Sequence, residues 1–188
     1  MRVLWMFAVL VSFAIVGPVT KVAAGNPETE PILNNLFAEL KLAKSERAAL
    51  QIEQRIWQTW YKSGDDDIDR LMRQGRIALG ERAMREALDV ANEVVKRKPN
   101  YSEGWNFRAT ALFVAGRLDA SLEDVVKVLK LEPRHFGALS GTALIMLRKG
   151  DGAAALTAIN KALEIHPHLR GASEIIRQAG GTVKKDPI

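Results

Sequence analysis

Residues 99–133 read PNYSEGWNFRATALFVAGRLDASLEDVVKVLKLEP, and this stretch decides the fold. Its first half carries apolar residues at helical spacing, namely Trp105, Ala109 and Leu112. Gly116 ends that helix, because glycine tolerates a left-handed cap. A second apolar series follows: Leu122, Val125, Val126 and Leu129. Because Pro133 disfavours helix in the residue before it, the stretch predicts two antiparallel helices that close near Glu132.

The same plan recurs at a constant spacing on both sides of this stretch. Pro99, Pro133 and Pro167 are equally spaced, and Gly116 has its counterpart in Gly150. Further columns hold matching residues: Leu71, Trp105 and Leu139; Ala87, Ser121 and Ala155; Val94, Val128 and Ala162. A fixed period of about 34 residues indicates stacked helical hairpins, each of which needs its neighbour to bury its apolar face.

On this register the chain resembles the tetratricopeptide repeat (TPR) family from Ile68 to about His168. The repeats are then residues 68–101, 102–135 and 136–169. The second repeat departs from the family pattern after its aromatic residue, with Arg108, Ala109 and Leu112 where Leu, Gly and Tyr are usual. The resemblance implies an all-α fold, a right-handed superhelical arc of antiparallel helix pairs.

Two flanking segments are expected to complete the arc. Residues 32–67 read as a helical hairpin, a degenerate repeat. Its Trp57 and Trp60 would either plug the space before the first repeat or anchor a partner. Residues 170–179 predict a capping helix over the last open face, and residues 180–188 a disordered tail. Residues 31–179 resemble small exported TPR proteins of alphaproteobacteria in three phrases: Glu103-Gly104-Trp105-Asn106, Pro133-Arg134-His135-Phe136 and His166-Pro167-His168.

The N-terminus carries the pattern of an export signal. An apolar run from Val3 to Val16 precedes Gly17 and Pro18, and Val22-Ala23-Ala24 offers small residues to a signal peptidase. We therefore expect residues 1–24 to be a signal peptide, residues 25–31 a flexible leader, and the protein to be exported, in the periplasm. The alternative is an uncleaved segment that anchors the repeats to the membrane, although the run is short for a span.

Composition narrows the range of functions. The chain has no cysteine, so disulfides and thiol chemistry are excluded. It carries no paired acid and base at a motif spacing, no phosphate loop and no nucleophile elbow, so we expect no enzyme, no cofactor and no small-molecule substrate. The basic clusters at Lys96–Lys98 and Lys184–Lys185 do not predict nucleic-acid binding, because export removes that partner.

Histidine also fails to predict a metal site. His166 and His168 flank Pro167, and His135 lies one repeat earlier. Zinc requires three or four converging ligands, and a proline between two of them separates their directions. A polar role in the turns between repeats is the preferred interpretation.

Function is expected on the concave side of the arc, which the first helix of each repeat lines. The register places ten candidate residues there: Met72, Arg76, Leu79, Glu103, Asn106, Thr110, Phe113, Ser140, Leu144 and Leu147. Leu79, Phe113 and Leu147 hold the same position in successive repeats and would form an apolar stripe, which the C-terminal helix either covers or leaves open. The sequence thus predicts a non-catalytic module that binds another protein or an extended peptide.

Overall fold

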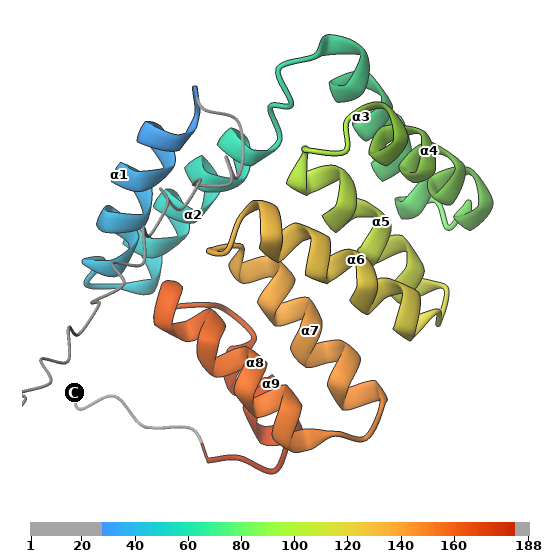
Figure 1. Ribbon diagram of the computed structural model, residues 1–188. Coiled ribbons are helices and arrows are strands. Elements are labelled where there is room, and N and C mark those ends of the chain that lie inside the picture. Colours follow the sequence, from blue (N-terminus) through green and yellow to red (C-terminus); the bar gives the residue numbers. More distant parts are fainter. Residues whose placement is uncertain (1–27, 183–188) are drawn as a thin grey trace, which may run out of the picture.

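The computed structural model describes residues 28–182, and all the regular structure among them is helical (Figure 1). The helices are α1 (Glu30–Lys41), α2 (Glu46–Trp60), α3 (Asp66–Gly80), α4 (Met84–Arg97), α5 (Ser102–Val114), α6 (Leu118–Leu131), α7 (Phe136–Arg148), α8 (Gly152–Ile165) and α9 (Ala172–Gln178). The predicted all-α fold is confirmed.

Three repeats follow the predicted period closely. The most extensive helix contacts are α3 with α4, α5 with α6 and α7 with α8, and α4, α6 and α8 each begin one full period after the last. Gly116 and Gly150 have φ angles of 76° and 79°, as the left-handed cap requires. In the first repeat Arg82 holds the equivalent position at a φ of 61°, so the turn is the same although glycine is missing.

Side chains cap some of the helices and not others. Ser45 and Asp151 cap α2 and α8, accepting hydrogen bonds from the backbone of Ala48 and Ala154. Asp65 caps α3. Asp119, which also looks suited to capping, lies inside the first turn of α6, and that helix has no side-chain cap.

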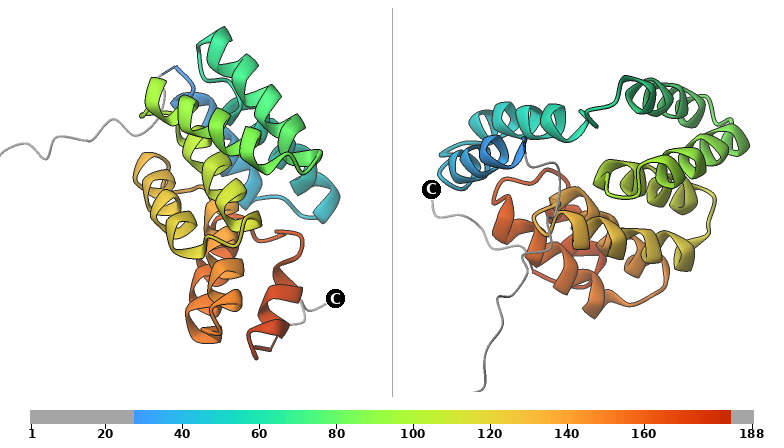
Figure 2. Two further views of the ribbon diagram at one scale, coloured as in Figure 1. Left: turned by 90° about the vertical axis from the view of Figure 1, so that its right-hand side faces the viewer. Right: turned by 45° about the horizontal axis from the view of Figure 1, so that its top comes forward.

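The amino-terminal hairpin of α1 and α2 packs against the third repeat, not against the first as the sequence suggested. Helix α1 contacts α8, and buried side chains of α1 and α2 share one core cluster with α7, α8 and α9. Neither α1 nor α2 makes a comparable contact with α3 or α4. The arc therefore curls until its two ends meet, with an extended connection from α2 to α3 (Figure 2).

Exposed apolar surface explains this placement. The first repeat buries its apolar residues together with Tyr101 and Phe107, and of its large apolar side chains only Ile77 is widely exposed. The third repeat instead offers Phe136, whose ring is buried against Phe37, Trp57 and Trp60 of the hairpin. A solenoid end with an uncovered apolar face needs a cap, and here the hairpin and α9 supply it together.

The termini of the folded part also differ from expectation. Helix α1 begins at Glu30 with Pro31 in its first turn, a position that proline tolerates, so the end of the predicted leader is helical. Gly180, Gly181 and Thr182 are placed, and Gly181 N donates a hydrogen bond of 2.9 Å to Ile176 O. The predicted signal peptide, residues 25–27 of the leader and residues 183–188 lie outside the described residues.

Within residues 28–182, no helix is long and apolar enough to cross a membrane.

Candidate protein-binding groove

A hollow of about 400 Å³ lies between α5 and α7, and α2 forms one of its walls. Its lining comes from α2, α5, α6 and α7 and from the turn after α8. Most of the side chains are apolar or small: Glu53, Trp57, Asn106, Ala109, Thr110, Phe113, Val114, Ser121, Val125, Phe136, Gly137, Ala138, Ser140, Gly141, Leu144, Ile145 and Leu169. At its mouth Val114 and Leu144 are 53% and 38% exposed. Exposed apolar side chains beside a hollow are typical of a binding surface.

Five of the ten candidate residues meet at this hollow: Asn106, Thr110, Phe113, Ser140 and Leu144. They come from one side of α5 and α7, as the repeat register predicted. The structure also shows whether the C-terminal helix covers this surface or leaves it open. Helix α9 packs on α8 and α7 and not on α5, so it leaves the space between α5 and α7 uncovered.

The other five candidates lie elsewhere. Met72 and Glu103 are interior residues, 1% and 2% exposed, and do not line an open surface as expected. Arg76 is exposed on α3 with its guanidinium 4.9 Å from the Tyr61 ring centroid. Leu79 and Leu147 are half-buried and pack into separate core clusters. The expected stripe of Leu79, Phe113 and Leu147 is therefore not continuous, because inter-repeat packing divides it.

Glu103 is buried because it holds the turn on which the hairpin docks. His135 Nδ1 accepts a hydrogen bond of 3.0 Å from Ala138 N, so its Nε2 carries the proton and donates to Glu103. The Trp60 indole stacks on the His135 ring at a centroid distance of 4.2 Å. Arg134 next to it bonds Asn34 and Glu30 of α1. This turn fixes the hairpin, and with it the wall of the groove.

The wall itself rests on a second polar contact. Glu53 accepts hydrogen bonds of 3.2 Å from Trp57 Nε1 and from His166 Nε2. The hydrogen bond from His166 is the main cause that lowers the pKa of Glu53. Both carboxylate oxygens of Glu53 thus accept hydrogen bonds within the chain, where Glu53 borders the hollow.

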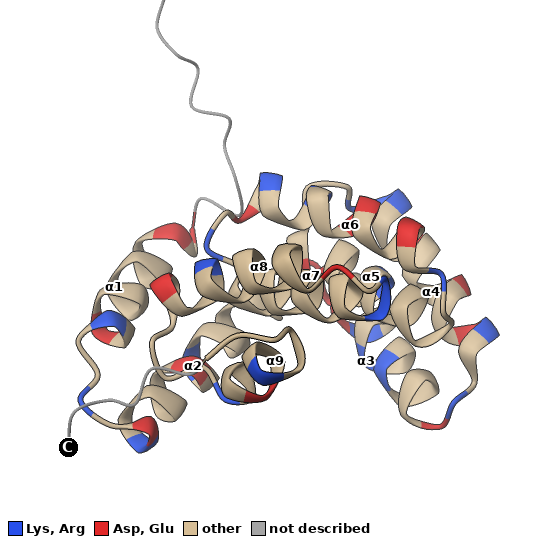
Figure 3. Ribbon diagram, turned by 90° about the horizontal axis from the view of Figure 1, so that it is seen from below, with Lys and Arg blue, Asp and Glu red and all other residues tan. Residues whose placement is uncertain are grey.

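Charge is sparse around the groove. Helix α7 carries a single charged residue, Arg148, whose guanidinium lies 3.9 Å from the Phe113 ring centroid and donates to Phe113 O. Seen from below, lysine, arginine, aspartate and glutamate lie mainly at helix ends and on outer helices (Figure 3). The surface between α5 and α7 is therefore suited to a neutral, apolar partner rather than to a charged one.

Comparison with known proteins agrees with this architecture. The sequence model of the tetratricopeptide repeat matches residues 68–129 and 108–169. A TPR repeat-containing protein of Rhizobium etli is 40% identical over 142 residues, which cover 76% of this chain and 70% of that protein. The chain belongs to the tetratricopeptide repeat family. The predicted family and its alphaproteobacterial character are thus confirmed.

Two solved structures share the TPR fold. The TPR2B domain of yeast Sti1, in its complex with pHsp70, superposes with a TM-score of 0.58 at 19% identity, covering 62% of this chain and 98% of that one. The crystal structure of MamA gives a TM-score of 0.53 at 15% identity, covering 81% and 84%. TPR proteins are generally repeat scaffolds, and the repeats of this chain support a protein-protein interaction module.

Histidines in this TPR protein serve packing. His168 Nε2 donates a hydrogen bond of 2.9 Å to Ala43 O, while His135 and His166 pair with glutamates. Among residues 28–182 no group of three or more His, Cys, Asp or Glu is placed to hold a metal. The half-buried Arg108 finds a carboxylate partner, with two hydrogen bonds of 2.7 Å to Asp124.

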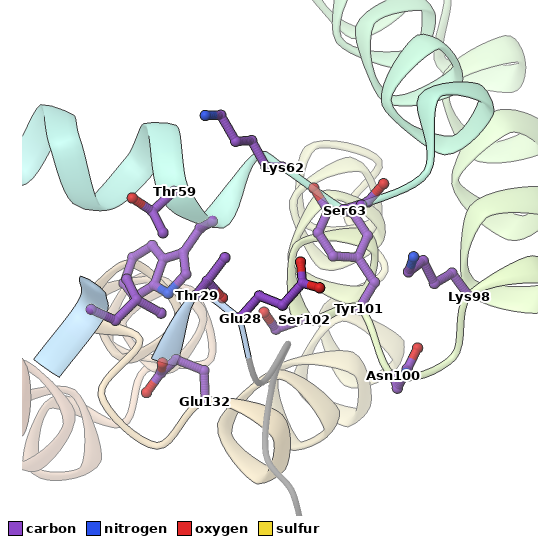
Figure 4. A pocket seen from close by; sticks show the side chains of 13 residues that line it. Glu28, Thr29, Thr59, Lys62, Ser63, Lys98, Asn100, Tyr101, Ser102 and Glu132 are labelled. Atoms are coloured by element: carbon purple, nitrogen blue, oxygen red, sulfur yellow. The ribbon is translucent and has the colours of Figure 1, made fainter. Parts of the chain in front are cut away.

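A second cavity, of about 280 Å³, lies where the hairpin meets the turn between α4 and α5 (Figure 4). Its lining is more polar and includes Lys98, Tyr101 and Glu132. Tyr101 Oη donates a hydrogen bond of 3.1 Å to Tyr61 O, and Glu132 accepts from Arg134. The side chains thus tie the connection after α2 to the repeats.

Sequence reasoning missed the α2 side of the groove. Glu53 and Trp57 come from a hairpin expected at the other end of the arc, so no repeat register could place them beside α7. Gly141 was also missed, although a signal existed, because a glycine stands there in a column that holds Phe107 one repeat earlier.

Proposed function

We propose that this TPR protein works outside the cytoplasm and holds a segment of another protein in the hollow between α5 and α7. The observation that supports this proposal most directly is the hollow itself, an apolar space of about 400 Å³ with Val114 and Leu144 exposed at its mouth. The family supports the binding class. In the solved TPR2B structure the same fold is seen in complex with a partner, pHsp70.

Site-specific photo-crosslinking tests this proposal. A photoreactive residue at Leu144 in the groove is compared with one at Val126, which is 46% exposed on α6 outside the groove. We expect one discrete protein to be trapped from position 144 and not from position 126. Equal trapping from both positions, or none from position 144, would refute a groove-centred function.

Leu144→Glu sharpens the experiment. The Leu144 side chain is partly exposed, so a carboxylate there stays hydrated and the fold is retained. In the groove, however, a partner would have to desolvate that charge. We expect trapping from a photoreactive residue at Val114 to fall in this variant, while Val126→Glu leaves it unchanged.

The proposed location outside the cytoplasm depends on the predicted signal peptide. The apolar run from Val3 to Val16 and the small residues before Gly25 support cleavage after Ala24. The alternative function is a membrane-anchored assembly scaffold that retains its N-terminal segment. N-terminal sequencing of the mature protein distinguishes them, since a chain beginning at Gly25 supports the released form and one beginning at Met1 supports the anchored form.

A further inference from the structure

The hollow between the second and third repeats has a counterpart between the first and second, where one side chain fills it. Phe107 of α5 is 5% exposed and belongs to the core cluster of the first repeat. A Cβ added to Gly75 of α3 would lie 2.6 Å from Phe107 Cε1 and 3.0 Å from Val90 Cγ1. The phenyl ring therefore lies directly against α3, between two adjacent repeats.

The third repeat lacks this ring. Gly141 occupies the position one repeat after Phe107, and Ala109 the position one repeat after Gly75. Ser121 and Val125 correspond in the same way to Ala87 and Ala91, which belong to the cluster around Phe107. All four residues, Ala109, Ser121, Val125 and Gly141, line the hollow. The hollow thus includes the place where a phenyl ring would stand if the third repeat resembled the second.

There is open space beside Gly141, as expected if it stands where the second repeat has Phe107. A Cβ added to Gly141 meets no other heavy atom within 4 Å. An apolar cavity of about 150 Å³ is enough to bind benzene, and the hollow, with its mouth, measures about 400 Å³. Ala109 is one carbon larger than Gly75, so an inserted ring would lie slightly farther from α5 than Phe107 lies from α3.

We propose that the partner segment inserts an aromatic side chain of phenyl type into this hollow. This inference rests on the proposed function and names the chemistry that the groove selects. Trp57, Phe113 and Phe136 line the hollow, and aromatic rings prefer edge or offset contacts with one another. Both oxygens of Glu53 accept hydrogen bonds from within the chain, so a neutral ring does not have to supply a partner for that carboxylate.

Small phenyl compounds test the proposal without a known partner. N-acetyl-phenylalanine amide is titrated against the whole folded protein and compared with the leucine and alanine analogues, with NMR shifts of the α5 and α7 amides as the readout. We expect the phenylalanine compound to bind tightest and to shift residues around Gly141. Equal binding of the leucine compound, or shifts confined to other helices, would overturn the inference.

Two variants at one position provide the control. Gly141→Phe supplies the ring from within the chain, and we expect it to weaken binding of the phenyl compound by about tenfold or more. Gly141→Ala adds only a methyl group and leaves the hollow open, so it keeps the binding. If Gly141→Phe fails to fold, Gly141→Leu makes the same comparison. Undiminished binding to the filled variant contradicts the proposal.

The two proposals can fail separately. Trapping of a partner from Leu144, together with no preference for the phenyl compound, would refute the aromatic anchor and leave the binding function in place. Tight phenyl binding without any trapped protein would refute the binding function, and the assignment of the ring to a protein partner with it.

Discussion

At the scale of single residues, Arg82 holds a strained backbone conformation, which the other repeats avoid by having glycine. Its φ of 61° is left-handed, whereas the equivalent residues are Gly116 and Gly150. A residue other than glycine in this region costs about 1–2 kcal/mol of backbone strain. Glycine avoids the strain but loses more conformational entropy on folding, which offsets part of the gain. We predict that Arg82→Gly raises the free energy of unfolding by about 0.5–1 kcal/mol, measured by urea denaturation.

The reverse change is its control. Gly116→Arg places a side chain at a φ of 76°, where an added Cβ meets nothing within 4 Å. Strain in the backbone is then the main cost, and the lower entropy of the unfolded chain offsets part of it, so stability should fall by about 0.5–1 kcal/mol. A stability gain for Gly116→Arg would show that left-handed strain does not govern these turns.

Two helical glycines should respond to alanine in opposite directions. Gly141→Ala adds a methyl group in open space and removes a poor helix former, so we predict a gain of about 0.5–1 kcal/mol. Gly75→Ala would place Cβ 2.6 Å from Phe107, and repacking should cost about 1–3 kcal/mol. Thermal unfolding of both variants checks the signs, and two gains would mean that the Phe107 ring is not packed on α3.

At the scale of elements, the hairpin's attachment depends on its tryptophans. Trp60 is 5% exposed, stacks on His135 and contacts Phe136. Truncating such a side chain costs about 3–5 kcal/mol, so Trp60→Ala should detach α1 and α2 before the repeats unfold. Hydrogen exchange should then show protection lost in residues 30–60 and retained in α5 and α6. Trp105→Ala, half-buried and remote from the hairpin, should leave the hairpin protected.

Acid should loosen the same contact. The pKa of Glu53 is lowered chiefly by its hydrogen bond from His166, so ionised Glu53 stabilises the folded state. That contribution is present above the ordinary pKa of glutamate and is lost as the pH falls through the lowered value. We predict that tryptophan fluorescence reports hairpin loosening as the pH falls below the ordinary pKa of glutamate, and that Glu53→Gln reduces this dependence. An unchanged profile in Glu53→Gln would assign the acid response to other groups.

The elements also show what the sequence can and cannot predict. The period placed the helix boundaries and the cap at Gly150, because these signals are local and repeated. The docking of the hairpin depends on pairs such as Arg134 with Glu30 and His168 with Ala43, which lie far apart in the sequence. No local sequence pattern encodes such pairs. The sequence therefore predicted the α5 and α7 sides of the groove but not its α2 wall.

At the scale of the whole molecule, closure of the arc shapes the binding surface. A plain TPR arc presents its full concave side to a partner. In this protein Phe107 of the second repeat closes the surface of the first repeat, and the hairpin covers the start of α7, where Trp57 lies against Gly137. What remains is a short hollow over the second and third repeats, suited to one anchored segment rather than to a long extended chain.

The most direct measurement of this closed arrangement uses spin labels, because the chain has no native cysteine to interfere. Labels at Asn35 in α1 and Lys161 in α8 are compared with labels at Asn35 and Arg73 in α3. Since α1 packs on α8 and makes no such contact with α3, the first pair should give the shorter distance and a narrow distribution. A shorter distance between α1 and α3 would mean that the hairpin stacks on the first repeat and that the groove has no α2 wall.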